Sequence, residues 1–194
     1  ARRSLWLEAF GGSTRQPPPE RLRAVADVLT RTIRQGDELS GPVLDGREGT
    51  FDVVLGNPPY RRERDAKSLF DRVAATSFGR RWRMARMDLW YYFVHRAIEL
   101  LAPGGTLAMI LNAYWTAGRG AEKLIDHLRR ETHIDEVFDL DRIEVFPGVS
   151  GRHMILCATK AGGSGPTRIQ RAMPRRGTRD ASAPIDLAAM LRGQ

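Results

Sequence analysis

Residues 51–60 read FDVVLGNPPY and predict a strand followed at once by a rigid turn. Gly56 ends the apolar run, and two prolines then hold the backbone extended just beyond the strand. In open α/β sheets, ligands bind at this end of the strands. We therefore expect a buried strand that delivers polar groups to a binding site, from its apolar residues Phe51, Val53, Val54 and Leu55.

The turn Asn57-Pro58-Pro59-Tyr60 has the groups needed to activate a weakly nucleophilic amine. The lone pair of a ring amine is delocalised, and acceptors on both N–H bonds would free it for attack. The Asn57 side-chain oxygen and the Pro58 carbonyl can be these acceptors, and Tyr60 can stack on a base drawn out of a duplex. This pattern is typical of amino-methyltransferases that use S-adenosylmethionine. The alternative is a plain turn after a strand, since Asn-Pro often starts turns.

The chain is strongly basic, and much of its charge is local. Its 31 Lys and Arg residues exceed its 23 Asp and Glu residues by eight. Residues 61–86, directly after the turn, hold nine basic and three acidic side chains, a surplus of six. We expect a basic loop there that binds nucleic-acid phosphates through Arg61, Arg62, Arg80, Arg81 and Arg83. The alternative is an arginine-rich loop that is merely solvated.

Composition narrows the class of protein further. A chain of 194 residues, 42% of them hydrophobic, has room for about one domain with its own core. We expect no membrane span and no secretory signal in its opening residues. The lone Cys157 cannot form an internal disulfide, and four scattered histidines give no zinc-ligand spacing. The expectation is a cytoplasmic protein without a metal site.

Helix-like and strand-like segments alternate and predict an α/β fold. Helices are expected over residues 2–10, 20–33, 88–101 and 120–131. Strands are expected over residues 51–56, 106–111, 134–140 and 153–159. Asp88 is the expected N-cap of the third helix, and Ala102-Pro103-Gly104-Gly105 its stop. These elements favour a mostly parallel sheet with a late antiparallel strand, followed by a linker or tail over 161–194.

Three stretches resemble the N6-adenine DNA methyltransferases of bacterial restriction–modification systems. They are the turn itself, DLWYYFVHRAIELLAPGGTLAMILNAYW (88–115) and VFDLDRIEVFPGVSGRHMILCATK (137–160). The resemblance covers about residues 1–160 and implies a partial Rossmann-like, S-adenosylmethionine-dependent methyltransferase sheet. It implies methyl transfer to the N6 amine of adenine in double-stranded DNA, with Asn57, Pro58 and Tyr60 as catalytic residues. It also implies that Tyr60 and Phe146 stack on opposite faces of the flipped adenine.

The opening of the chain resembles the cofactor half of the same family. Residues 2–7 (RRSLWL) resemble the helix after the strand that binds the cofactor ribose, and Asp37 of Gln35-Gly36-Asp37 matches the residue that bonds the cofactor's adenine. The family's glycine-rich turn is absent, and Phe10-Gly11-Gly12-Ser13 does not replace it because it follows a helix-like segment. We therefore expect a partial catalytic domain over 1–160, inactive alone, without the cofactor loop or the target-recognition domain. The implied cofactor is S-adenosylmethionine, and a restriction endonuclease in the same chain or system is an implied partner.

Two other interpretations stay open. Methyltransferases that act on a release-factor glutamine or a ribosomal RNA guanine amine share the Asn-Pro-Pro-Tyr turn, although the basic segment and the loop at Phe146 argue against them. The second is a non-catalytic nucleic-acid-binding remnant, favoured by the missing cofactor loop. His95, Trp82, Trp90 and Trp115 are expected to pack in the protein and to take no part in chemistry.

Overall fold

The computed structural model describes residues 18–41, 43–117, 120–140, 151–162 and 164–172. The chain divides into two compact units, Ala1–Val43 and Leu44–Gln194. The first contains helix α2 (Pro19–Thr32), which matches the helix predicted over 20–33. The helix predicted over 2–10 lies outside the described residues.

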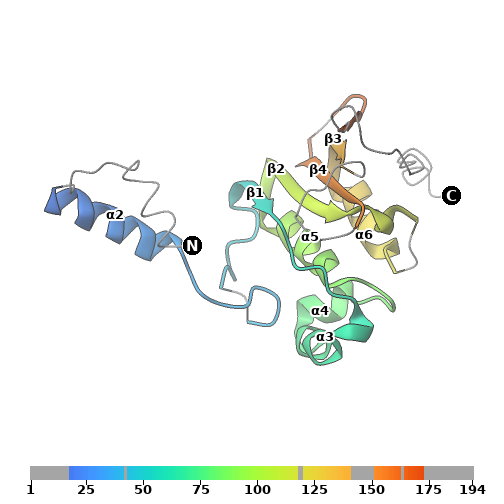
Figure 1. Cartoon of the computed structure of the whole chain (residues 1–194), viewed down its shortest axis with the longest axis horizontal. Helices are drawn as coiled ribbons and strands as arrows, with labels where there is room; N and C mark the ends of the chain where they lie inside the picture. The colour runs from blue at the N-terminus through green and yellow to red at the C-terminus, as the bar shows by residue number, and fades with distance from the viewer. Residues whose placement is uncertain (1–17, 42, 118–119, 141–150, 163, 173–194) are drawn as a thin grey trace, which may run out of the picture. The chain divides into compact units, whose positions relative to one another are not determined.

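The second unit is built on a five-stranded sheet in the order β1-β2-β4-β3-β5, counted over the described residues (Figure 1). The strands are β1 (Phe51–Gly56), β2 (Leu101–Asn112), β3 (Thr132–Asp139), β4 (His153–Lys160) and β5 (Arg168–Arg171). β1 is parallel to β2 and β3 to β5, whereas β4 is antiparallel to both β2 and β3. β4 therefore runs against the other strands, which confirms the predicted parallel sheet with a late antiparallel strand.

Helices α5 (Leu89–Leu100) and α6 (Glu122–Glu131) pack on this sheet and on each other. The core between helices and sheet includes the fully buried side chains of Trp90, Tyr92, Ile98, Leu107, Leu111, Leu124 and Met154. Asp88 occupies the predicted N-cap position of α5, but its side chain makes no capping hydrogen bond. No helix in the described part of the chain has the length and apolar character needed to cross a bilayer.

β1 is less buried than the sequence predicts. It is an edge strand of the described sheet, and Val53 and Leu55 are 54% and 73% exposed. An apolar run indicates a strand, but whether the strand is buried depends on the other segments that pack against it. Among the described residues, β2 alone pairs with β1, so the expectation of a buried strand is wrong for this part of the molecule.

β2 begins earlier than expected, directly after α5. Pro103-Gly104-Gly105 forms part of β2, where the β1–β2 register shifts between Phe51 and Val53. Gly104 has a φ of 79°, and a Cβ on Gly105 would lie 2.8 Å from the Phe51 carbonyl oxygen. Both glycines are thus required for a compact helix-to-strand connection.

Residues 61–86, expected to be a loop, are largely helical, and we call them the basic insert. They contain the 3-10 helix η1 (Glu63–Asp65) and the α-helices α3 (Lys67–Ala74) and α4 (Ser77–Trp82). Phe70 and Val73 bury the inner face of α3, and Figure 1 shows α3 and α4 side by side. The helical pattern of α3 is weak in the sequence because only two of its residues are buried. Charged residues outnumber apolar ones around them, so the segment looked like a loop.

β5 lies within the segment predicted to be a linker or tail. Its four residues are all exposed, so no apolar alternation marks it in the sequence. It is held by parallel pairing with β3 and by an ion pair of 3.0 Å between Arg171 Nε and Asp139 Oδ2. The sheet therefore extends past residue 160, the predicted end of the catalytic domain.

Candidate active site

The Asn57-Pro58-Pro59-Tyr60 turn leaves β1 at the carboxyl end of the parallel β1–β2 pair. Gly56, the last residue of β1, pairs with Met109 of β2. The prolines that follow have no N–H group, so the parallel ladder cannot continue in the same way. Asn57 is exposed and Pro58 is buried. The turn therefore presents an amide to solvent from an anchored backbone.

Tyr60 folds back over the end of β2. Its hydroxyl oxygen lies 2.9 Å from the Ile110 carbonyl oxygen and 3.1 Å from Asn57 Oδ1. Ile110 is one residue beyond Met109, the last residue of β2 that pairs with β1, so the hydroxyl supplies a donor where the prolines supply none. The Tyr60 ring meets His153 of β4 edge-on, with ring centroids 5.7 Å apart. Burial raises the pKa of the Tyr60 hydroxyl, which keeps it protonated and able to donate.

The residues after Tyr60 pair with the segment that leads into α5. Arg62 and Asp88 form an antiparallel bridge, and the Leu89 N–H donates to the Arg61 carbonyl at 2.8 Å. The Glu63 carboxylate then accepts from Arg83 Nη2 at 2.9 Å and from the Arg86 backbone N–H at 3.0 Å. We call these two contacts of one carboxylate the Glu63 clamp. The clamp closes the two ends of the basic insert onto each other next to the turn.

The arginines predicted to bind nucleic acid fall into two groups. Arg80 Nη1 donates to the Ala75 carbonyl at 2.6 Å, Arg81 pairs with Glu99 at 3.2 Å, and Arg83 pairs with Glu63 and, at 3.4 Å, with Asp71. These three hold the insert together. Arg61 and Arg62 are exposed directly after the turn. The structure thus separates arginines with a folding role from arginines that lie beside the turn.

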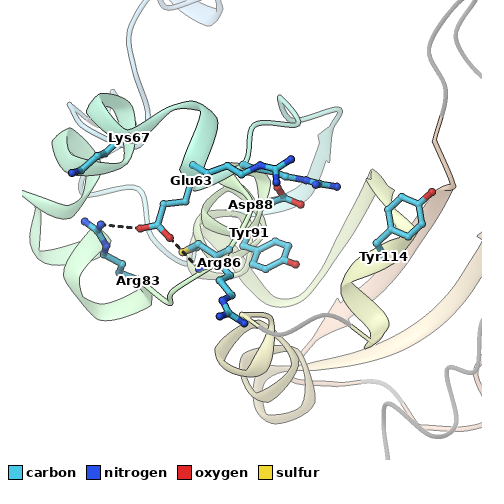
Figure 2. Close-up of a pocket in the computed structure, with 10 residues that line it drawn as sticks. Glu63, Lys67, Arg83, Arg86, Asp88, Tyr91 and Tyr114 are labelled. Carbon is cyan, nitrogen blue, oxygen red and sulfur yellow. Dashed lines mark hydrogen bonds and ion pairs between the residues drawn. The ribbon is translucent and has the colours of Figure 1, made fainter.

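A pocket of about 690 Å³ lies between the insert and the residues that follow β2 (Figure 2). Its lining consists of Arg62, Glu63, Arg64, Lys67, Arg83, Arg86, Met87, Asp88, Tyr91 and Tyr114. Met87 and Tyr91 are buried, whereas Tyr114, in the 3-10 helix η2 (Ala113–Ala117), is 53% exposed. Desolvation raises the pKa of Asp88 against the opposing effect of Arg62. The pocket therefore combines an apolar floor with a mainly cationic rim.

The sequence matches the Eco57I restriction-modification methylase family over residues 1–146, which is most of the chain. The chain belongs to this family. The type II methyltransferase M.XhoI of Xanthomonas vasicola is 32% identical over 127 residues, which cover 64% of this chain and 22% of the relative. The type II methyltransferase M.PaeR7I of Pseudomonas aeruginosa is 28% identical over 148 residues, covering 75% and 24%. The chain thus spans about a quarter of the length of these family members.

Family membership agrees with the fold. A modification subunit from a type I restriction enzyme of Vibrio vulnificus YJ016 superposes with a TM-score of 0.55 at 14% identity, over 81% of this chain and 34% of that one. At this identity the likeness concerns the fold alone. The predicted α/β fold class of a methyltransferase sheet is confirmed for this family member.

Two residues assigned by the sequence resemblance are not joined to the turn by this structure. Phe146 lies outside the described residues. Asp37 belongs to the first unit, where its carboxylate accepts from the Leu39 N–H at 3.1 Å and from the Ser40 hydroxyl. Those contacts form a local Asx-type turn, and a carboxylate with four lone-pair sites can accept a further hydrogen bond. The roles of both residues remain predictions.

The other side of the basic insert packs on α5 and α6. The Trp82 ring stacks on His95 and His127, with centroids 3.9 and 4.2 Å away, and the two imidazole Nδ1 atoms lie 2.8 Å apart. Burial lowers the pKa of both imidazoles, that of His127 to about 4. We call Trp82, His95 and His127 the aromatic–histidine cluster. It confirms that these residues pack, as do the buried Trp90 and Trp115.

Sequence patterns did not single out three residues of the pocket. Lys67 and Arg86 were counted in the charge of residues 61–86, and Tyr114 follows the predicted strand 106–111. Their placement depends on the helical path of the insert and on the Glu63 clamp.

Proposed function

We propose that this chain carries the catalytic turn of a restriction–modification enzyme that transfers a methyl group to the N6 amine of adenine in DNA. Family membership supports the enzyme class, and the names of the matched relatives, type II methyltransferases, support the reaction. One observation carries the assignment: the Asn57 amide is exposed at the carboxyl end of β1 while Pro58 and Tyr60 fix the turn around it.

The proposed chemistry uses two acceptors on one amine. The Asn57 side-chain oxygen and the Pro58 carbonyl accept the two N–H bonds of the adenine amine and turn its lone pair toward the methyl donor. S-adenosylmethionine, when bound, supplies the electrophilic methyl group. The amine attacks directly and the proton then leaves to water, so the mechanism requires no general base.

The Tyr60 hydroxyl orients the Asn57 amide in this proposal. The hydroxyl has one proton to donate and two neighbours. Because the Ile110 carbonyl can only accept a hydrogen bond, the hydroxyl donates its proton to that carbonyl. The contact at 3.1 Å is then satisfied when the Asn57 amide nitrogen donates to the tyrosine oxygen, an assignment that exchanges amide nitrogen and oxygen. In this orientation the Asn57 oxygen faces outward, where an amine can meet it.

The remaining assignments follow the family resemblance. Tyr60 and Phe146 would stack on opposite faces of the flipped adenine, and Asp37 would accept a hydrogen bond from the cofactor's adenine amine. This role for Asp37 rests on the match of Gln35-Gly36-Asp37 to the family's turn. Arg61 and Arg62 would contact DNA phosphates, while Arg80, Arg81 and Arg83 would add to the field that attracts DNA. A restriction endonuclease would act in the same chain or system.

The test is Asn57→Ala in the complete protein that contains this chain. We expect methyl transfer to adenine in duplex DNA to fall by about 10²–10³-fold, because one of two oriented acceptors is lost. Binding of S-adenosylmethionine and DNA is expected to change little. Asp52→Ala is the matched control, since Asp52 is an exposed polar residue of the same strand, and it should keep full turnover.

Near wild-type turnover in Asn57→Ala would contradict the catalytic assignment. The substrate assignment has a separate readout. Methylation of a release-factor glutamine or a guanine amine of ribosomal RNA, with none of adenine in DNA, would replace adenine as the substrate while leaving Asn57 in its role.

A further inference from the structure

The lining of the pocket beside the turn includes cations that form no ion pair or side-chain hydrogen bond among the described residues. Its lining holds five basic residues and two acidic ones, a surplus of three. Arg83 is taken by the Glu63 clamp, Arg64 pairs with Asp65 at 3.3 Å, and Arg62 lies in the field of Asp88. Among the described residues, the side chains of Lys67 and Arg86 form no ion pair or hydrogen bond, and both are exposed. An anion in the pocket can therefore pair with these two without breaking a contact of the described fold.

The backbone of Arg86 is held in a conformation that few side chains adopt. Its φ is 66°, in the left-handed region, which is strained for a residue other than glycine. Two contacts hold it there. Glu63 accepts from its N–H at 3.0 Å, and Gly120 packs so closely that a Cβ would lie 2.6 Å from the Ala85 carbonyl oxygen and 3.1 Å from that of Arg86. The structure thus fixes the base of an arginine whose guanidinium has no partner in the described protein.

The shape and floor of the pocket suit a chain more than a single ion. Figure 2 shows Lys67 and Tyr114 at opposite ends of the lining residues, with Tyr91 and Asp88 between them. A volume of about 690 Å³ far exceeds one phosphate group and lies in the range of sites that hold extended ligands. Buried Met87 and Tyr91 offer an apolar surface between cations. A sugar–phosphate backbone has this alternation of apolar sugar and anionic phosphate.

The pocket opens at the same edge of the sheet as Asn57. Arg62 follows Tyr60 by two residues, and Tyr114 follows β2, the strand that Tyr60 contacts through the Ile110 carbonyl. A base that is drawn out of a duplex stays attached to its own strand. The strand that carries the target base must therefore pass close to this pocket.

We propose that the pocket binds the sugar–phosphate backbone of the DNA strand that carries the target base, with Lys67 and Arg86 on successive phosphates. The proposal rests on the proposed function, since it takes DNA as the substrate. It adds a defined backbone site and assigns it to residues outside the set predicted from the sequence.

The test compares two double variants of the complete protein, Lys67→Gln/Arg86→Gln and Arg80→Gln/Arg81→Gln. Both remove two positive charges from the basic insert, so they change its net charge equally. Affinity for a short duplex containing the recognition site is measured at several salt concentrations. In the first variant, the slope of log affinity against log salt should fall by about 0.9 for each lost phosphate contact. In the second, the slope should change much less.

Each outcome has one meaning. Equal slope changes in the two variants would show that net charge alone is read, which overturns the pocket site. An unchanged slope in the first variant overturns it as well, and Lys67→Gln alone gives the same readout at an exposed position if the double variant folds poorly. Loss of turnover in Asn57→Ala with wild-type slopes in both double variants would leave the proposed function standing and remove only this inference. Absence of salt-dependent DNA binding by the wild type would remove both.

Discussion

The two sides of the basic insert differ in whether their polar groups are exposed or buried. On the side facing the pocket, the charged ends of Lys67 and Arg86 are exposed and have no partner among the described residues. On the side facing α5 and α6, even the imidazoles of His95 and His127 are buried and bonded to each other. Both sides belong to one segment of 26 residues with a charge surplus of six.

The difference shows how a basic segment divides its charges between folding and binding. Arg81 and Trp82 Nε1 both reach Glu99 of α5, at 3.2 and 3.1 Å, so the inner side is tied to the core. Groups that satisfy each other in this way stabilise the fold and leave little for a ligand. Groups left exposed beside Asn57 cost the fold little and remain available. We therefore expect substitutions on the inner side to change stability and those on the pocket side to change function.

Of the variants that test this difference between the two sides, Trp82→Ala is expected to have the largest effect, a loss of stability. Removing a ring that stacks on two imidazoles should cost about 3 kcal/mol of stability around α4 and α5. Native-state hydrogen exchange of the α5 amides in the complete protein measures this loss. Arg64→Gln is the control on the pocket side, because an exposed ion pair contributes about 0.5 kcal/mol or less. Similar losses in the two variants would break the comparison.

The next effect concerns pH and the same cluster. The pKa of each buried imidazole lies below its ordinary value of 6.5, so unfolding takes up protons in mildly acidic solution. Stability is full above pH about 6.5 and falls as pH drops toward about 4, by about 1.4 kcal/mol per pH unit for each histidine that titrates on opening. Hydrogen exchange of α5, followed from pH 7.5 to 5 with correction for the intrinsic rate, gives the slope.

His127→Gln sharpens that measurement. It removes one of the two imidazoles, so the slope should fall by about 1.4 kcal/mol per pH unit. An unchanged slope in His127→Gln would mean that the cluster does not set the pH dependence.

The smallest effect is expected from Tyr60→Phe, at the turn. The ring remains for stacking, but the hydroxyl that orients the Asn57 amide is lost, and kcat should fall about fivefold, the scale of one net hydrogen bond. DNA affinity and the fluorescence of 2-aminopurine at the target position should stay as in the wild type. Tyr60→Ala should lower both, since it also removes the ring. Full kcat in Tyr60→Phe would remove the hydroxyl from the mechanism.

Much of the fold could be predicted because its signals are local. Three elements carry their own apolar pattern and end signals: the strand before Asn57, the helix from Leu89 and the strand from His153. These three begin within one or two residues of their predicted starts. The late antiparallel strand, β4, was expected from the order of helices and strands. In contrast, β5 carries no apolar pattern, and its place depends on the backbone groups that β3 offers.

The place of the turn was predictable, but the surroundings of the turn were not. The position of Asn57 at a strand end follows from the sequence of the turn alone. The fate of each arginine does not, since the partners of Arg81 and Arg83 lie 18 and 20 residues away in sequence and meet them only after the insert has folded. The exposure of β1 likewise depends on neighbours that a single strand does not encode.

The bridge between Arg62 and Asp88 joins the backbone of the cationic pocket to that of the Asn57-Pro58-Pro59-Tyr60 turn. The connection runs through main-chain atoms and one side chain, that of Glu63, so the fold fixes the distance between the Arg86 backbone and Asn57. In the proposed function this unit sets the distance between the phosphate bound at Arg86 and the amine bound at Asn57. A strand gripped at Arg86 can present to Asn57 only an amine that lies one fixed reach away along the extruded nucleotide. The enzyme would then select amines first by their distance from the bound phosphate, and only afterwards by hydrogen bonds to the edge of the base.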